Sequence, residues 1–71
     1  MSKKELDFAV FCIESIAGHF NQNGADVYKV LAESGILDNY LIKCYDVLHT
    51  LGKDYLVQDI AAYMEELGLE L

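Results

Sequence analysis

The sequence contains no proline and no low-complexity segment, and it has only five basic side chains against twelve acidic ones. Because nothing in it resembles a linker, its 71 residues predict one domain, residues 1–71. The formal net charge is −7. Nucleic acids and anionic membranes are bound through clustered cations, so this charge argues against both kinds of partner.

Segments that would carry the chain to or across a membrane are also missing from the sequence. The start, MSKKELDF, has carboxylates where a signal peptide needs an apolar core. No apolar run approaches the ~18–20 residues of a membrane span. We therefore expect a cytoplasmic protein whose two cysteines, Cys12 and Cys44, are buried free thiols. A disulfide between them is compatible with geometry but is not indicated.

What the chain has in excess is apolar residues, which make up 54% of it, with a mean hydropathy of +0.18. A domain of this size buries only roughly 60% of the surface that its unfolded chain exposes. Some apolar side chains are therefore expected to face a partner, either another protein or a second copy of the chain. The acidity favours a basic protein partner.

Apolar residues recur with the period of a helix in four segments, which predicts an all-α, compact bundle of four short helices. The predicted helices are residues 3–20, 24–34, 37–51 and 55–67. Ser2 and Glu5 form a capping-box pattern before the first helix, and Asp54 is a plausible N-cap for the last. The start of the last helix stays open, because Tyr55–Val57 has strand propensity and could be extended.

The densest apolar stretch runs from Ile36 to Gly52 and predicts an enclosed central helix on which the others pack. Asp38 lies near its start, where a carboxylate can cap free N–H groups, and Gly52 follows its end as a natural C′ residue. Gly35 is expected to close the preceding helix in the same way. The predicted apolar stripe of this helix comprises Leu37, Leu41, Cys44, Leu48 and Leu51.

The inward faces of the other helices follow from the same periodicity. For the first helix the predicted inward arc comprises Leu6, Ala9, Val10, Ile13, Ile16, Ala17 and Phe20, with Cys12 at its margin. Phe8 and Phe11 lie outside this arc, one turn apart, and are expected to form a small exposed patch. The second helix should turn Val27, Tyr28, Val30 and Leu31 inward, and the last helix Leu56, Val57, Ile60, Ala61, Met64 and Leu67.

Chemical motifs are scarce. Cys12 and His19 share a face but lie roughly 10 Å apart along the axis, too far for one tetrahedral zinc ion. Asp46 and His49 are one turn apart, a spacing that could orient a catalytic base, but no nucleophile elbow accompanies them. We therefore predict no catalytic residues, no metal site and no cofactor. A small ligand-binding or enzymatic domain using Asp46, His49 and Tyr45 or Tyr55 remains an alternative.

The end of the central helix is the best candidate for an interaction surface, because its polar and aromatic residues are not required by core packing. Tyrosine combines apolar area with a polar tip and is favoured at interfaces. The candidate surface residues are Tyr45, Asp46, His49, Thr50, Lys53, Tyr55, Phe8 and Phe11. A further alternative is a transcriptional regulator, since residues 58–64 resemble the first helix of a helix-turn-helix. The acidity and the short remaining chain speak against it.

Four stretches together resemble a known family. They are FAVFCIE (residues 8–14), GADVY (24–28), ILDNY (36–40) and YDVLHTLGK (45–53), of which the last is the most specific. They are similar to a family of short, uncharacterised bacterial proteins (domain of unknown function three-seven-nine-one), over nearly the whole chain. Some family members are encoded beside proteins of toxin type that look like ADP-ribosyltransferases. The resemblance thus implies an accessory or antitoxin-like role, and it supplies no catalytic residues.

Overall fold

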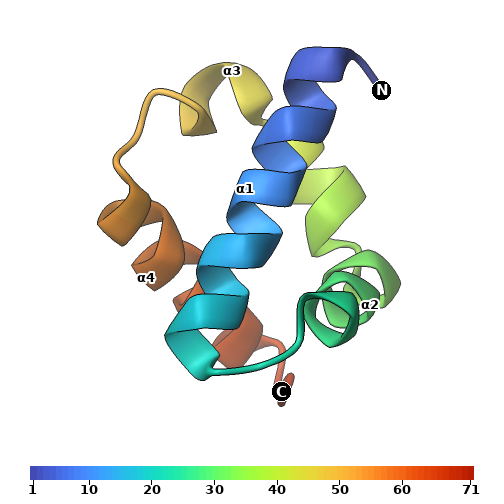
Figure 1. Ribbon diagram of the computed structural model, residues 1–71, viewed down its shortest axis with the longest axis vertical. Coiled ribbons are helices and arrows are strands. Elements are labelled where there is room, and N and C mark those ends of the chain that lie inside the picture. The colour runs from blue at the N-terminus through green and yellow to red at the C-terminus, as the bar shows by residue number, and fades with distance from the viewer.

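The computed structural model describes residues 1–71 and contains helices but no strands (Figure 1). This confirms the predicted all-α bundle. The helices follow in the order α1 (Lys3–Phe20), α2 (Gly24–Ser34), η1 (Leu37–Ile42), α3 (Tyr45–Leu48) and α4 (Lys53–Glu66). Helix α1 contacts α2, η1 and α4, so the longest helix is the one around which the others are arranged. None of the helices combines the length and the apolarity needed to cross a membrane.

Helix α1 begins at the capping box that the sequence predicts. The Ser2 hydroxyl oxygen accepts the Glu5 backbone N–H at 3.2 Å, and the Ser2 N–H donates to Glu5 Oε1 at 2.8 Å. The hydrogen bond from the Ser2 backbone lowers the pKa of Glu5 below its usual value, helped by the bond to the Ser2 hydroxyl. The helix ends at Asn21, whose φ of 54° reverses the chain toward α2.

Helix α2 has a side-chain cap at its start and a glycine at its end. Asn23 Oδ1 accepts the Ala25 N–H at 2.7 Å. Gly35 has a φ of 86°, as predicted for a glycine that closes a helix. A Cβ at position 35 would also lie 2.9 Å from Asn39 Nδ2, so a larger residue there meets both backbone strain and a neighbouring side chain.

The predicted continuous helix 37–51 is wrong. We call residues 36–52 the middle segment. Within it, residues 37–42 form the π-helical turns of η1 and residues 45–48 form the single short helix α3. Between them Cys44 has φ −101° and ψ 20°, which bends the chain. The bend places Tyr45 against α1 while Leu48 is still buried. No side chain caps either piece, so Asp38 does not have the predicted capping role.

The start of the last helix also differs from the prediction. Helix α4 begins at Lys53, so Asp54 lies in its first turn and Tyr55–Val57 is helical, which removes the extended alternative. Gly52 has φ −70° and ψ 157°, so it is the N-cap of α4 and not the predicted C′ residue of the helix before. Residues 49–52 therefore connect the end of α3, which no glycine closes, directly to α4.

The core is formed by 14 buried apolar residues from all five helices and Ile36. They are Phe8, Ala9, Cys12, Ile16, Val27, Leu31, Ile36, Leu37, Leu41, Leu48, Leu56, Val57, Ile60 and Met64. No polar or charged residue is buried with them. The molecule therefore has a wholly apolar interior, and every polar side chain keeps some contact with solvent.

Several predicted inward residues lie on the surface instead. Phe8 is buried and Leu6 and Val10 are exposed, so the inward arc of α1 is rotated from the predicted one. Helix α1 is apolar on several sides, and the arc that becomes core is the one that α2, η1 and α4 cover. Three further residues that were predicted to face inward are exposed, namely Phe20, Tyr28 and Leu67. Cys44, which was predicted to be buried, is half-buried.

Candidate functional site

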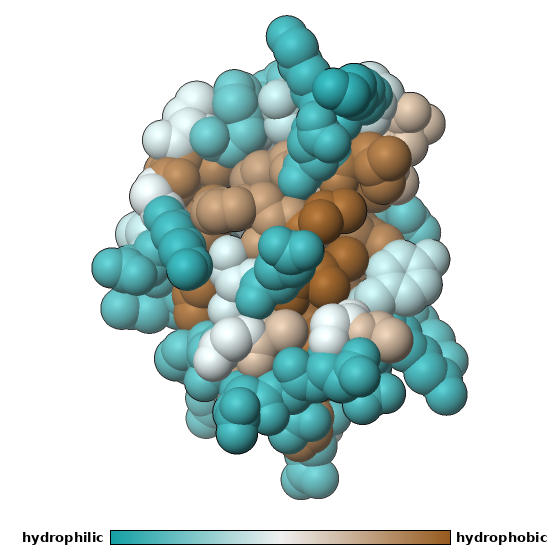
Figure 2. Space-filling view, in the orientation of Figure 1, coloured by the Kyte–Doolittle hydropathy of each residue, from teal (hydrophilic) through white to brown (hydrophobic).

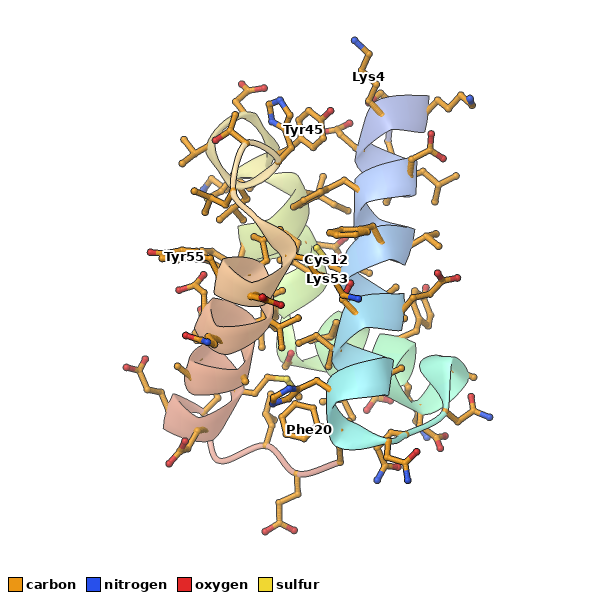
Figure 3. All side chains as sticks on the ribbon, turned by 60° about the vertical axis from the view of Figure 1, so that its left-hand side comes forward. Lys4, Cys12, Phe20, Tyr45, Lys53 and Tyr55 are labelled. Carbon is orange, nitrogen blue, oxygen red and sulfur yellow. The ribbon has the colours of Figure 1, made fainter.

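The predicted surface at the end of the middle segment is organised by three aromatic rings. Phe8 on α1 meets the Tyr45 ring edge to face, with centroids 5.5 Å apart and an angle of 80°. The other side of Tyr45 is stacked on the His49 ring at 4.3 Å and 6° (Figure 3 shows Tyr45 between α3 and α1). Because two rings hold it, Tyr45 is half-buried. Phe8 is core, which corrects its predicted place on the surface and breaks the expected Phe8–Phe11 patch.

His49 is fixed by the same helix. Its Nδ1 lies 2.6 Å from the backbone oxygen of Tyr45, and since a carbonyl can only accept, Nδ1 carries the proton. Asp46 is exposed and makes no hydrogen bond to this ring, and the Thr50 hydroxyl donates to the backbone oxygen of Val47 at 2.7 Å. No hollow adjoins these residues.

The remaining predicted surface residues lie elsewhere on the molecule. Tyr55 is exposed on α4, and in Figure 3 it projects away from α1. Lys53 lines a shallow hollow of about 310 Å³ between the start of α4 and the second half of α1. Phe11 is exposed on the outside of α1. The structure therefore brings Tyr45 and His49 together but leaves Phe11, Lys53 and Tyr55 separate from them.

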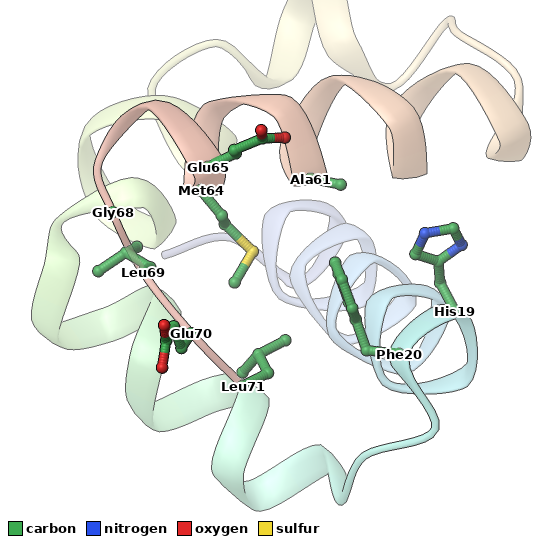
Figure 4. Close-up of a pocket in the computed structure, with 9 residues that line it drawn as sticks. All are labelled: His19, Phe20, Ala61, Met64, Glu65, Gly68, Leu69, Glu70 and Leu71. Carbon is green, nitrogen blue, oxygen red and sulfur yellow. The ribbon is translucent and has the colours of Figure 1, made fainter.

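The largest hollow, of about 500 Å³, lies at the opposite end of the molecule, where the tail after α4 passes the end of α1 (Figure 4). Met64 forms part of its floor, and Phe20 and His19 form one wall with their rings edge to face at 4.8 Å. Leu69 and Leu71 of the tail close the other side (Figure 4). This hollow was not predicted from the sequence, because Leu69 and Leu71 lie after the last predicted helix, residues 55–67.

A third hollow, of about 360 Å³, joins η1 to α4 and is lined by Tyr40, Asp59, Ala62, Tyr63 and Glu66. The Tyr40 hydroxyl donates a hydrogen bond to Asp59 Oδ2. The Tyr40 and Tyr63 rings meet edge to face, with centroids 5.2 Å apart and an angle of 88°. Partial burial, together with the hydrogen bond to the Asp59 carboxylate and its negative charge, raises the pKa of Tyr40 well above its usual value. We call these five residues the tyrosine–acid corner.

Sequence reasoning missed this corner, although part of its signal was present. Asp59, Tyr63 and Glu66 are spaced four and three residues apart and therefore share one face of α4. Their partner Tyr40 is 19 residues away from Asp59 and lies on η1, so the two meet only after the chain has folded.

The two thiols differ in their exposure to solvent. Cys12 is buried, and this burial raises the pKa of its thiol to about 12, so the thiolate is a minor form at neutral pH. Cys44 is free as well and is half-buried. No group of three or more His, Cys, Asp or Glu side chains is arranged to hold a metal ion.

One family model matches most of the sequence. The family model described as "Protein of unknown function (DUF3791)" matches residues 7–67. The match confirms the family resemblance of the motifs at residues 8–14, 24–28, 36–40 and 45–53. No curated protein and no solved structure matches the chain.

Proposed function

This chain belongs to the DUF3791 family, and we propose that it serves as a helical protein–protein interaction module in the cytoplasm. The docking face is the outer α1 surface, defined by Leu6, Val10 and Phe11. The partner is a basic protein that presents an apolar helix or loop. As an accessory or antitoxin-like subunit, the module would act by covering a surface of that partner.

The exposure of the outer α1 surface is the observation that carries this proposal. Leu6, Val10 and Phe11 are 51%, 43% and 42% exposed. Leu6 and Val10 are four residues apart, so they are neighbours on the helix, whereas Phe11 lies about 100° further round it, beyond Asp7 and Glu14. Figure 2 shows apolar residues gathered on the face of the molecule that α1 occupies. Neighbouring apolar side chains at the surface, such as Leu6 and Val10, are typical of interaction sites.

The charges around this surface indicate the sign of the charge that the partner should carry. The helix carries Asp7 and Glu14 among its exposed residues, and the whole chain has a net charge of −7. The one ion pair within the chain joins Lys3 to Asp7, at 3.9 Å between two exposed side chains, and such pairs add little stability. A basic rim on the partner would therefore be attracted to this face and would speed association.

The two alternative functions have less support. The enzymatic alternative lacks a hollow at His49, and the ring is oriented by the Tyr45 carbonyl and not by Asp46. The helix-turn-helix alternative used residues 58–64, which lie within α4 and contribute Ile60 and Met64 to the core. The residues after α4 are not helical, so this segment is not followed by a recognition helix within residues 67–71.

Two measurements test the proposal. Light scattering gives the oligomeric state of the chain alone, and a pull-down with the product of the neighbouring gene gives its capture of that protein. We expect capture of that basic partner by the unmodified chain. Val10→Lys should reduce it about tenfold or more, because a cation replaces an apolar contact at the centre of the face.

Leu67→Lys is the matched control. Leu67 is exposed to a similar degree, at 47%, but lies at the far end of α4, and the substitution changes the charge equally. Equal loss of capture in both variants would mean that overall charge and not this face is responsible. A strictly monomeric protein that captures no neighbouring product would overturn the proposal.

A further inference from the structure

The tyrosine–acid corner has an unused capacity to bind positive charge. Asp59 is half-buried, and the Tyr40 hydroxyl occupies one of its carboxylate oxygens, Oδ2. The other oxygen makes no hydrogen bond within the chain, and neither does the Glu66 carboxylate. Neither carboxylate forms an ion pair with a lysine or histidine of this chain, because the one ion pair present joins Lys3 and Asp7. Two acceptors thus line one hollow without a cation.

Two aromatic rings complete the lining of this hollow. Tyr40 and Tyr63 both line the hollow and stand at 88° to each other, so their faces point in perpendicular directions. Ring faces carry negative potential and attract cations within about 6 Å of the centroid. The rings are held in place from both sides, Tyr40 by its hydrogen bond to Asp59 and Tyr63 by packing against the core. A cation entering the hollow would therefore meet a preformed surface.

We infer that the tyrosine–acid corner binds an organic cation, the guanidinium group of an arginine side chain presented by the basic partner. A guanidinium is flat, stacks on aromatic rings and can donate two hydrogen bonds to one side of an acceptor. A compact ammonium cannot use a ring face and a carboxylate edge in the same way. A metal ion would need more ligands than the corner supplies, since no cluster of three metal-binding side chains is present.

The protonation states within the corner suit this ligand. The Tyr40 hydroxyl is protonated in the neutral range, and its raised pKa keeps it a donor to Asp59 in alkaline solution as well. Asp59 is thereby fixed in orientation by a group on another helix, while its negative charge remains available for a second donor. The hollow of about 360 Å³ is open enough to admit the end of a side chain.

As a contact for the partner, this site rests on the function proposed above, but its chemistry is tested without any partner. The probe is Nα-acetyl-arginine N-methylamide, titrated into the full-length protein and followed by NMR. We expect saturable shifts of the Tyr40 and Tyr63 ring protons and of the Ala62 amide, in the millimolar range. The matched probe is the corresponding citrulline derivative, which has the same shape but no charge and should give no saturable shift.

Variants of the corner separate local binding from general attraction to an acidic protein. Asp59→Asn should weaken binding about fivefold or more, because a charged acceptor is lost. Glu66→Gln should weaken it up to about fivefold, as expected for a more exposed pair. Glu65→Gln is the matched control, since it removes the same charge one residue away from Glu66 and does not line the corner. It should leave the dissociation constant unchanged.

The contribution of the Tyr63 ring to arginine binding is tested separately. Tyr63→Leu should weaken binding about twofold to fivefold, whereas Tyr63→Phe retains the ring face and should bind like the unmodified protein. Circular dichroism confirms that each variant is folded. Shifts spread over the acidic surface, an equal effect of Glu65→Gln, or equal binding of the citrulline probe would overturn the inference.

The outcomes for the site and for the proposed function are distinguishable. Val10→Lys lies on α1, away from the corner, and should reduce partner capture without changing the arginine titration. Asp59→Asn should reduce both. Arginine binding without any capture of a partner leaves the corner established and removes the interaction function. Capture that is unaffected by Asp59→Asn removes the corner as a contact.

Discussion

Helices α1 and α2 and the middle segment bury apolar side chains equally well, but their backbones are specified in different ways. Each of the two helices begins at a side-chain cap, Ser2 or Asn23, and ends at a left-handed residue. The middle segment has no side-chain cap and is divided at Cys44, yet Leu41 within it is as inaccessible as Leu31 of α2. Apolar periodicity therefore decides which residues enter the core, whereas local capping decides whether the backbone there is a regular helix.

The largest test of this comparison is truncation of a core leucine in each region. Leu31→Ala and Leu41→Ala should each lower the free energy of unfolding by about 2–5 kcal/mol, since both side chains are fully buried. Val47→Ala, at an exposed position of α3, should change it by less than about 0.5 kcal/mol. Urea unfolding followed by circular dichroism measures all three.

A domain of this size has a total stability of only about 3–5 kcal/mol, so both alanine variants could be unfolded in buffer. Leu31→Met and Leu41→Met then keep the comparison, because a volume-conserving change usually costs less than about 1.5 kcal/mol. A full effect at Leu31 with almost none at Leu41 would show that the middle segment is not part of the core.

The reaction rates of the two thiols give a second comparison of α1 with the middle segment. Cys12 on α1 is buried with a pKa of about 12, whereas Cys44 at the bend is half-buried. At pH 8, Cys44 should react with a disulfide reagent about 100-fold faster or more, because Cys12 reacts only when its surroundings open. Mass spectrometry of singly labelled protein identifies the site. Labelling of both thiols at one rate would mean that α1 and the middle segment open together.

Tyr40 connects the middle segment to α4 and makes the link between them sensitive to alkali. Its pKa is raised in the folded protein, so the unfolded chain loses this proton first as the pH increases. The corresponding stability is complete below about pH 10 and is lost as the pH rises above it. Tyr40→Phe should remove that part of the alkaline loss and cost about 1 kcal/mol at pH 7. Tyr28→Phe, at an exposed tyrosine of α2, is the control and should follow the unmodified protein in urea melts between pH 7 and 11.

The smallest effects should come from the caps. Asn23→Ala removes the bond to the Ala25 N–H and should cost about 0.5–2 kcal/mol. Asp38→Ala should be nearly neutral, because Asp38 caps no N–H group at the start of η1. Thermal melts of the two variants measure the difference. A loss at Asp38 as large as that at Asn23 would show that η1 begins as a capped helix in solution.

Much of this fold was predictable, and the errors have a common origin. The bounds of α1 and α2 agree with the predicted ranges because Ser2, Asn23 and Gly35 act on their own neighbours in the chain. The predicted helix 37–51 failed because it had apolar spacing but no local signal for the bend at Cys44. Of the candidate site, Tyr45 and His49 do lie together, whereas the Tyr40–Asp59 contact spans 19 residues and could not be read from spacing.

By itself the sequence determined the all-α class, the two capped helices and the acidic, apolar-rich surface, because composition and capping depend only on residues close together in the chain. The tertiary structure alone decided which side of α1 is buried, because that helix is apolar on several sides and its neighbours select one of them. Packing buried Phe8 and left Leu6 and Val10 in solvent. The bend at Cys44 set Tyr45 against Phe8 and so completed the core with Leu48. In the same way the fold brought Tyr40 to Asp59, because a bond between two helices exists only after the helices have packed.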